Sequence, residues 1–352
     1  MQPYATYEEI RRQPETWRTS LDFMSETKDP ILRFIRENQP KSVLFTGCGT
    51  SYYLSLTAAR FFQVQTGIPA HAVPASEVML QPSSVIRPHP APLLIASSRS
   101  GETTEVVRAV EEVRRRKLAR CLAVTCEPSS RLTEVADFSI PLPHTREKSV
   151  VMTGSFTNML LALQLFAAFL SENQNVLEDM QKLPRLGQKQ LLTAEEQARQ
   201  TALDESRNHL IYLGLGEYYG LACEAMLKMK EMTQLFCEAY NPLEFRHGPI
   251  SVLNEDCRVF LLSGRTSREY DADLIPDLRK QGSDVKVVGE PTDSLDPGQR
   301  VDLPPGLEDG CRSILYLPFF QFLAYYQTLQ LKLNPDQPRN LGQVVRLGKK
   351  GE

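Results

Sequence analysis

Short apolar runs alternate with longer amphipathic segments along the first half of the chain. Each run has the character of a buried strand and ends at a glycine or a turn. Most are followed by a segment with the period of an amphipathic helix. Strands that alternate with helices predict an α/β fold with a doubly wound parallel sheet. The runs are Val43–Phe45, Ala70–Val73, Leu93–Ala96 and Cys121–Val124.

The second half of the chain repeats this pattern. The stretch HLIYLGLGEYYGLACEAMLKMKE from His209 has the layout of VLFTGCGTSYYLSLTAARFF from Val43: an apolar run, Gly-x-Gly, an aromatic pair and an amphipathic segment. Gly47, Ser98 and the Glu-Pro dipeptide at Glu127 recur in the same order at offsets of 167, 165 and 163 residues. A nearly constant offset of domain length predicts two tandem domains that arose by internal duplication, and it excludes a solenoid array.

The duplication suggests how the chain divides. The polar helical stretch Ser171–Gln200 separates the two halves, so we expect the boundary between the domains there. The expected parts are an N-terminal helical extension over 1–30, a first domain over 31–172, a helical linker over 173–200, a second domain over 201–334 and a C-terminal tail that closes the site over 335–352.

Composition narrows the class of protein. The chain has 352 residues and a formal net charge of −3, which argues against nucleic acid as a partner because phosphate-backbone binders carry a basic face. Its N-terminal segment lacks the apolar core of a signal peptide. Pro318 and several glutamines interrupt the apolar region Ser313–Leu333, so we expect a buried helix there and no membrane span. Seven scattered cysteines without a CxxC pair indicate reduced thiols, a cytoplasmic location and no metal site.

Hydroxyl side chains are concentrated between the third apolar run and the helix predicted after it. In SSRSGETT, they belong to Ser97, Ser98, Ser100, Thr103 and Thr104. Loops at the carboxyl ends of parallel strands converge on a crevice, where a helix N-terminus offers N–H groups to an anion. Neutral donors and a glycine suit a phosphate monoester, and the second hydroxyl-bearing loop, GCGTS, favours the same ligand. The alternative is a plain helix N-cap with a capping box, for which hydroxyls are also favoured.

Motifs spread over nearly the whole chain, from about residue 40 to the terminal NPDQPRNL, show a family resemblance. They resemble the sugar-isomerase, or SIS, domain family. Within it they are similar to the isomerase half of glucosamine-6-phosphate synthase and to stand-alone aminosugar-phosphate deaminases and isomerases. The motifs are GCGTS (Gly47–Ser51), SRSGET (Ser98–Thr103), EKSVVMTGSFTNM (Glu147–Met159), EAMLKMKEMTQLFCEAY (Glu224–Tyr240) and EFRHGP (Glu244–Pro249).

The resemblance implies tandem SIS domains with a phosphosugar site in the first. It implies that hydroxyls of both loops hold the phosphate and that Arg99 and Val150 lie near the sugar. The second repeat has SGRTSREY, from Ser263, with sparser hydroxyls, so we expect one working phosphate site per chain. The substrate-binding residues implied are Gly49, Thr50, Ser51, Ser98, Arg99, Ser100, Gly101, Thr103, Val150 and Gln343.

Three charged residues, Glu224, Lys228 and Glu231, share one stripe of a predicted helix because of their spacing. Such a stripe is often a solvated face, but the apolar residues around it indicate a helix with little solvent. The resemblance implies that Glu231 moves a proton between C1 and C2 of an open-chain sugar, with Lys228 beside it and Glu224 in support. That chemistry needs one carboxylate that reaches both carbons, and a nearby ammonium can stabilise the developing oxyanion.

His247 stands in the Glu-x-x-His-Gly-Pro turn, where the resemblance places a ring-opening histidine. A cyclic sugar phosphate must pass a proton from its anomeric hydroxyl to the ring oxygen, and histidine has a suitable pKa for this. In the synthase this histidine reaches the neighbouring subunit's site, so the resemblance also implies a homodimer. The other histidines are interpreted as packing or capping residues.

Two departures from the synthase limit the reaction. The chain has Gln2 where the synthase has its N-terminal cysteine nucleophile, so we expect no use of glutamine-derived ammonia. It also has Gln343 where the synthase tail has the lysine that forms an imine with the ketose, and an amide cannot form a Schiff base. Lys349 or Lys350 could replace that lysine, although nothing in the spacing requires it. Enolisation survives these changes.

The sequence therefore predicts a cytoplasmic homodimer that needs no cofactor and binds neither nucleic acid nor membrane. Its expected activity is the deamination and isomerisation of glucosamine 6-phosphate or galactosamine 6-phosphate to a ketose 6-phosphate and ammonia. The alternatives are a ketose/aldose-phosphate isomerase, a fructosamine-phosphate deglycase and, from another class, a sugar-phosphate-sensing regulatory module. Glu231 and His247 weigh against a pure sensor.

Overall fold

The computed structural model describes residues 4–87, 92–292, 295 and 297–347. The chain forms two compact units. The first-repeat unit comprises Glu15–Gln181 and Gly342–Glu352, and the second-repeat unit comprises Met1–Pro14 and Lys182–Leu341. The division falls within one long helix, α10 (Gln174–Ala202), and the domain boundaries given above stay a prediction. Gln2, Lys349 and Lys350 lie outside the described residues.

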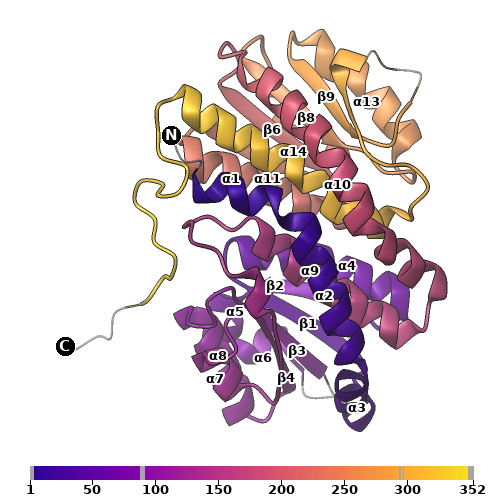
Figure 1. Ribbon diagram of the computed structural model, residues 1–352, viewed down its shortest axis with the longest axis vertical. Helices are drawn as coiled ribbons and strands as arrows, with labels where there is room; N and C mark the ends of the chain where they lie inside the picture. The colour runs from indigo at the N-terminus through magenta and orange to yellow at the C-terminus, as the bar shows by residue number, and fades with distance from the viewer. Residues whose placement is uncertain (1–3, 88–91, 293–294, 296, 348–352) are drawn as a thin grey trace. The chain divides into compact units, whose positions relative to one another are not determined.

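A five-stranded parallel sheet forms the centre of the first-repeat unit, in the order β2-β1-β3-β4-β5 (Figure 1). Its apolar strand residues are buried because helices cover them; Leu94 of β3, for example, lies in one hydrophobic cluster with Val106 and Val110 of α7. The strands are β1 (Ser42–Gly47), β2 (Ala70–Pro74), β3 (Pro92–Ser97), β4 (Arg120–Thr125) and β5 (Phe138–Pro141). The helices are α2 (Gln13–Glu26, most of it in this unit), α3 (Lys28–Asn38), α4 (Thr50–Thr66), α5 (Ala75–Leu80), α6 (Pro82–Val85), α7 (Thr104–Arg115), α8 (Arg131–Val135) and α9 (Gly154–Ser171).

The second-repeat unit has a sheet of the same design, in the order β10-β9-β8-β6-β7, again all parallel. In both units the first strand lies between the second and the third, so the topology agrees with tandem duplication. The strands are β6 (His209–Gly214), β7 (Phe236–Tyr240), β8 (Cys257–Leu262), β9 (Asp284–Gly289) and β10 (Arg300–Asp302). The α-helices are α1 (Ala5–Arg11), the greater part of α10, α11 (Glu217–Thr233), α12 (Pro242–Phe245), α13 (Arg268–Lys280) and α14 (Asp309–Gln330).

These sheets confirm the predicted α/β fold class with parallel sheets. The four apolar runs predicted as strands in the first half are all strands, each extended by one to three residues in total. The sequence did not single out β5, β7 or β10, which are short edge strands with mixed polarity.

Two helices bear on the question of membranes. The region expected as a buried helix is α14, which is almost entirely buried and ends at Gln330, before Leu333. Among the described residues, α9 is long and apolar enough to cross a bilayer, but 89% of its apolar stretch is buried inside the protein, as in the core helix of a globular domain.

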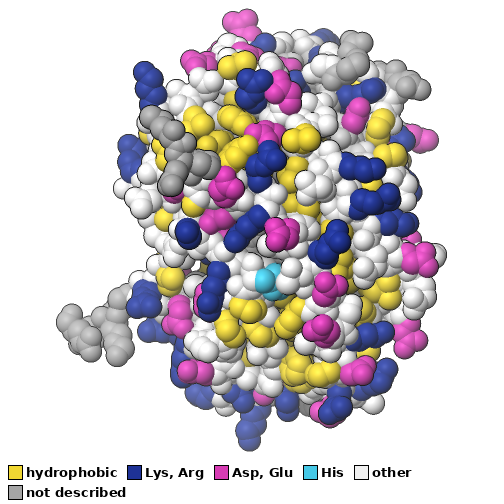
Figure 2. Space-filling view, in the orientation of Figure 1, with side chains coloured by type: hydrophobic (Ala, Val, Ile, Leu, Met, Phe, Trp, Pro, Cys, Tyr) yellow, Lys and Arg dark blue, Asp and Glu magenta, His cyan; other side chains and the backbone are white. Residues whose placement is uncertain are grey.

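On the face drawn in Figure 2, Lys and Arg side chains are interspersed with Asp and Glu rather than gathered in one basic patch.

Candidate functional site

The first hydroxyl loop joins β1 to α4. Gly49 has a φ of 51°, in the left-handed region that favours glycine, and Thr50 begins the helix. Gly47 is required by close packing, because a Cβ there would lie 2.5 Å from the carbonyl carbon of Ser51. Thr50 and Ser51 are 6% and 5% exposed, so two hydroxyls line a tight turn at the N-terminus of a 17-residue helix.

The second hydroxyl loop joins β3 to α7, at the carboxyl end of the strand that pairs with β1. Ser98 Oγ lies 3.1 Å from Thr103 Oγ1 and accepts the Gly101 N–H at 3.1 Å. Ser100 Oγ accepts the Glu102 N–H, also at 3.1 Å. Thr103 is the N-cap residue of α7, yet its side chain makes no capping hydrogen bond within the described residues. The hydroxyls therefore organise the loop itself, which is more than a plain N-cap requires.

Gly101 cannot be replaced without strain at this loop. Its φ is +64°, and a Cβ there would lie 2.1 Å from Ser130 Oγ. The Gly101 carbonyl accepts the N–H of Leu132 at 2.9 Å, which ties the loop to α8. The glycine thus lets the backbone of the hydroxyl loop approach its neighbour closely.

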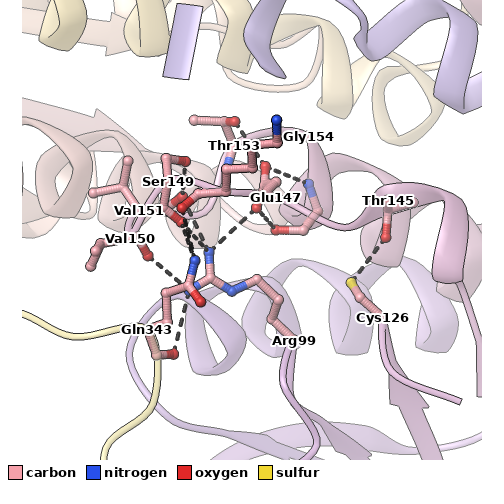
Figure 3. Close-up of polar contacts among 12 residues, drawn as sticks. Arg99, Cys126, Thr145, Glu147, Ser149, Val150, Val151, Thr153, Gly154 and Gln343 are labelled. Atoms are coloured by element: carbon pink, nitrogen blue, oxygen red, sulfur yellow. Dashed lines mark hydrogen bonds and ion pairs between the residues drawn. The ribbon is translucent and has the colours of Figure 1, made fainter. Parts of the chain in front are cut away.

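Arg99 lies between the two serines of this loop, but its guanidinium faces backbone carbonyls (Figure 3). Nη2 donates to the Val150 oxygen at 2.8 Å, and Nη1 donates to the Val151 oxygen at 3.2 Å. A longer contact of 3.4 Å reaches the Ser149 oxygen. Arg99 and Val150, both expected near the sugar, are therefore in direct contact, and Arg99 holds the segment 149–151 in place.

Glu147 is a buried anchor that the sequence analysis did not single out. Its side chain is 0% exposed, and its carboxylate accepts hydrogen bonds from the N–H and hydroxyl groups of Thr153 and Ser155, at the start of α9. Arg99 Nη1 lies 3.5 Å from the same carboxylate. The available signal was an acidic residue shortly before a Thr-Gly-Ser helix start, where a carboxylate satisfies free N–H groups.

Gln343 brings the C-terminal tail to this cluster. Its side-chain Nε2 donates to the backbone oxygens of Lys148 at 2.9 Å and Ser149 at 3.1 Å, and its own backbone oxygen lies 3.4 Å from Arg99 Nη2 (Figure 3). Further along the tail, the Leu347 N–H donates to Thr104 Oγ1 at 3.2 Å. The tail thus follows the hydroxyl loop to the N-terminus of α7.

Burial keeps the cysteine of the first loop, Cys48, in its unreactive thiol form. Cys48 follows Gly47, and burial, with a smaller contribution from the charge of Glu105, raises the pKa of its thiol to about 12. The thiol is therefore neutral at physiological pH. No group of three or more His, Cys, Asp or Glu side chains in the described part of the chain is placed to hold a metal ion.

The charged stripe lies on α11 of the second-repeat unit. Lys228 Nζ lies 2.5 Å from Glu231 Oε2 and 3.5 Å from Glu224 Oε1. The side chains of Lys228 and Glu224 are 1% and 0% exposed, whereas that of Glu231 is 20% exposed. The stripe is therefore a buried charged group that offers one carboxylate to solvent or to a ligand, and the solvated-face interpretation does not hold for it.

His247 is exposed in the turn after α12. Its backbone N–H donates to the Glu244 oxygen at 3.0 Å, and Gly248 follows with a φ of 136°. Neighbouring Arg246 is paired with Asp277 at 2.7 Å, while the imidazole makes no hydrogen bond or ion pair among the described residues. This histidine is available to a ligand or another chain.

Fold and site together define a class: a duplicated α/β protein with a hydroxyl-rich loop at a helix N-terminus and, in the second repeat, a buried lysine paired with two glutamates. The chain belongs to the SIS domain family, which matches residues 38–169 and 203–301. The two matched segments fall in the two repeats, and the resemblance described from the sequence is confirmed.

Relatives with assigned activities cover almost the whole chain. D-galactosamine-6-phosphate deaminase AgaS from Escherichia coli is 29% identical over 363 residues, covering 97% of this chain and 93% of that protein. Glutamine–fructose-6-phosphate aminotransferase from Aliivibrio fischeri is 28% identical over 327 residues, covering 88% of this chain and 52% of that protein. The crystal structure of glucosamine-6-phosphate deaminase from Thermotoga maritima has a TM-score of 0.78 and 28% identity, covering 97% of this chain and 100% of that one.

Proposed function

We propose that this protein deaminates and isomerises an aminosugar 6-phosphate, glucosamine 6-phosphate or galactosamine 6-phosphate, to the ketose 6-phosphate and ammonia. The observation that carries the proposal is the combination of a self-organised hydroxyl loop with a Lys228–Glu231 pair in which the glutamate alone is accessible. The similarity to deaminases over 97% of the chain supports the same reaction.

In the proposed reaction the hydroxyl loops hold the phosphate, and His247 opens the sugar ring. Glu231 takes the proton from C2 of the open-chain amino-aldose, and the electrons form an enolamine. Return of the proton to C1 leaves an imine at C2. Water adds to this imine and expels ammonia, so that one water is consumed for each ketose and ammonia formed. No protein-bound imine is needed, which is compatible with Gln343 in the tail.

Supporting roles follow from the contacts. Lys228 bonds the carboxylate of Glu231 and orients it, and its charge stabilises the oxyanion that develops at O1. Glu224 holds the other side of the lysine. We further propose a cytoplasmic homodimer in which His247 serves the partner's sugar, because the imidazole is exposed and no polar partner within the described residues engages it.

A substrate panel tests the proposal. Purified protein is incubated with the 6-phosphates of glucosamine, galactosamine and mannosamine, and ammonia and ketose are measured together. Equal amounts of both products are expected from glucosamine 6-phosphate or from galactosamine 6-phosphate. Glu231→Gln should lower the rate by about 10²–10⁴-fold, while Glu269→Gln, at an exposed glutamate of α13, should not.

Other outcomes would contradict the proposal in distinct ways. Ketose–aldose interconversion without ammonia would assign the alternative isomerase activity. Release of an amine from a fructosamine phosphate would assign a deglycase. Tight binding of sugar phosphates with no turnover by wild-type protein would favour a sensing module.

A further inference from the structure

The two repeats carry equivalent loops before equivalent helices. Ser98 follows β3, and its N–H donates to the Val124 oxygen of β4 at 3.0 Å. Ser263 follows β8, and its N–H donates to the Val288 oxygen of β9 at 2.9 Å. A helix, α7 or α13, begins a few residues later in each case. The place where an anion meets the helix N-terminus can therefore be compared directly between the repeats.

In the second repeat a side-chain carboxylate accepts hydrogen bonds from the hydroxyls of this loop. Ser263 Oγ donates to Asp271 Oδ2 at 2.6 Å, and Ser267 Oγ donates to the same oxygen at 2.7 Å. Asp271 lies in the first turn of α13 and is 4% exposed. Burial raises the pKa of Asp271, and the two hydroxyl hydrogen bonds counteract part of that rise. The first repeat differs: among the described residues, Ser98 Oγ has a hydroxyl and an N–H as hydrogen-bond partners and no carboxylate.

The cationic side chains of the second loop are also engaged. Arg265 and Arg268 stand 165 residues after Ser100 and Thr103. Both are paired with Glu290, at 2.7 and 3.2 Å. The hydrogen bonds from Arg265, and then the charge of Arg312, lower the pKa of Glu290 to about 2 in spite of its burial. Glu290 therefore stays ionised and retains these guanidinium groups.

We propose that Asp271 is a built-in anion: it fills the second repeat's counterpart of the phosphate loop and limits each chain to one phosphosugar site. The inference rests on the phosphate-binding role proposed above for the first loop. A cavity of about 210 Å³ adjoins the carboxylate and is lined by Ser263, Arg268 and Arg279 among others. Since a water molecule takes up about 30 Å³ of liquid, this cavity has room for an oxyanion. Without the carboxylate, two hydroxyls and the helix N-terminus remain, and the site has one fewer negative charge. The hydroxyls and the helix N-terminus then form a second oxyanion site.

Calorimetric titration with inorganic phosphate tests this proposal. Wild-type protein should bind one phosphate per chain, and Asp271→Ala should bind two. Asp271→Asn should still bind one, because an amide of the same shape remains in place. Asp273→Ala removes an exposed acid from the same helix and serves as the matched control, with one site expected.

The location of the new site is checked in a Ser98→Ala, Ser100→Ala background, where Asp271→Ala should retain one site. Asp271→Ser also removes the carboxylate and should likewise bind two phosphates. It is measured in parallel in case the alanine variant does not fold. One site in both folded variants, or two sites in wild type, would overturn the inference while leaving the first site intact. No phosphate binding by wild type would instead contradict the proposed role of the first loop.

Discussion

Replacing Arg99 with alanine should loosen the segment that carries Val150 and the tail that carries Gln343. The two shorter hydrogen bonds of its guanidinium, at 2.8 and 3.2 Å, are lost. Bonds to a charged group contribute about 1.5–3 kcal/mol each. We take the lower end, about 3 kcal/mol in total, because water can replace Arg99 at the half-buried Val150 carbonyl.

The loss of stability on Arg99→Ala does not include a penalty for leaving a buried charge without partners. Glu147 keeps its hydrogen bonds from Thr153 and Ser155 when Arg99 is removed, so the usual penalty for breaking a buried ion pair does not apply in full. For a domain of this size, about 3 kcal/mol corresponds to a fall in Tm of roughly 6–12 °C.

Differential scanning calorimetry and steady-state ammonia release are the measurements. Arg99→Ala should lower the Tm of the first-repeat unit and raise KM about tenfold, as expected if one phosphate hydrogen bond is lost with the loop's order. The Tm and KM of Arg99→Lys should lie between those of wild type and of Arg99→Ala. A compact ammonium cannot bond the Val150 and Val151 carbonyls at the same time, as the guanidinium does. Arg108→Ala, at an exposed arginine of α7, is the control. If Arg99→Ala melts within 2 °C (about 0.5–1 kcal/mol) of Arg108→Ala and keeps the wild-type KM, the arginine does not hold this segment.

Three further changes probe other parts of the site. Ser100→Ala should weaken fructose 6-phosphate binding about tenfold with little change in Tm, since one hydrogen bond to a charged ligand is lost. Unchanged affinity by calorimetry would remove Ser100 from the phosphate site. Glu231→Gln should bind fructose 6-phosphate normally but exchange its C1 proton with D₂O about 10²–10⁴-fold more slowly; exchange at the wild-type rate would mean that another residue is the base. Mixed dimers of His247→Ala and Glu231→Gln should recover about a quarter of wild-type activity, because random exchange gives about half mixed dimers, each with one intact site. If activity does not recover although subunit exchange is confirmed, His247 acts in its own chain's site or outside catalysis.

The sequence alone was sufficient for the architecture, because that is governed by local periodicity. Apolar runs that end at Gly47 and Gly214 before helical segments determine parallel strands and their crossovers, and the offset between these glycines reveals the duplication. Edge strands such as β10 (Arg300–Asp302) bury fewer residues, so their patterns were too weak to identify. The hydroxyl loop was also recognisable, since its residue types and the helix after it lie next to each other in the chain.

Only the tertiary structure decided how the side chains are used. Arg99 turns from the loop towards carbonyls 50 to 52 residues away and a tail residue 244 away, contacts that no local pattern contains. The loops after β3 and β8 have similar compositions, yet their hydroxyls have different partners. Ser263 and Ser267 donate to the carboxylate of Asp271, whereas Ser98 Oγ contacts the Thr103 hydroxyl and the Gly101 N–H. Hydrogen bonds and ion pairs depend on distance in space, and the fold sets that distance by bringing separate strands and helices to one sheet edge.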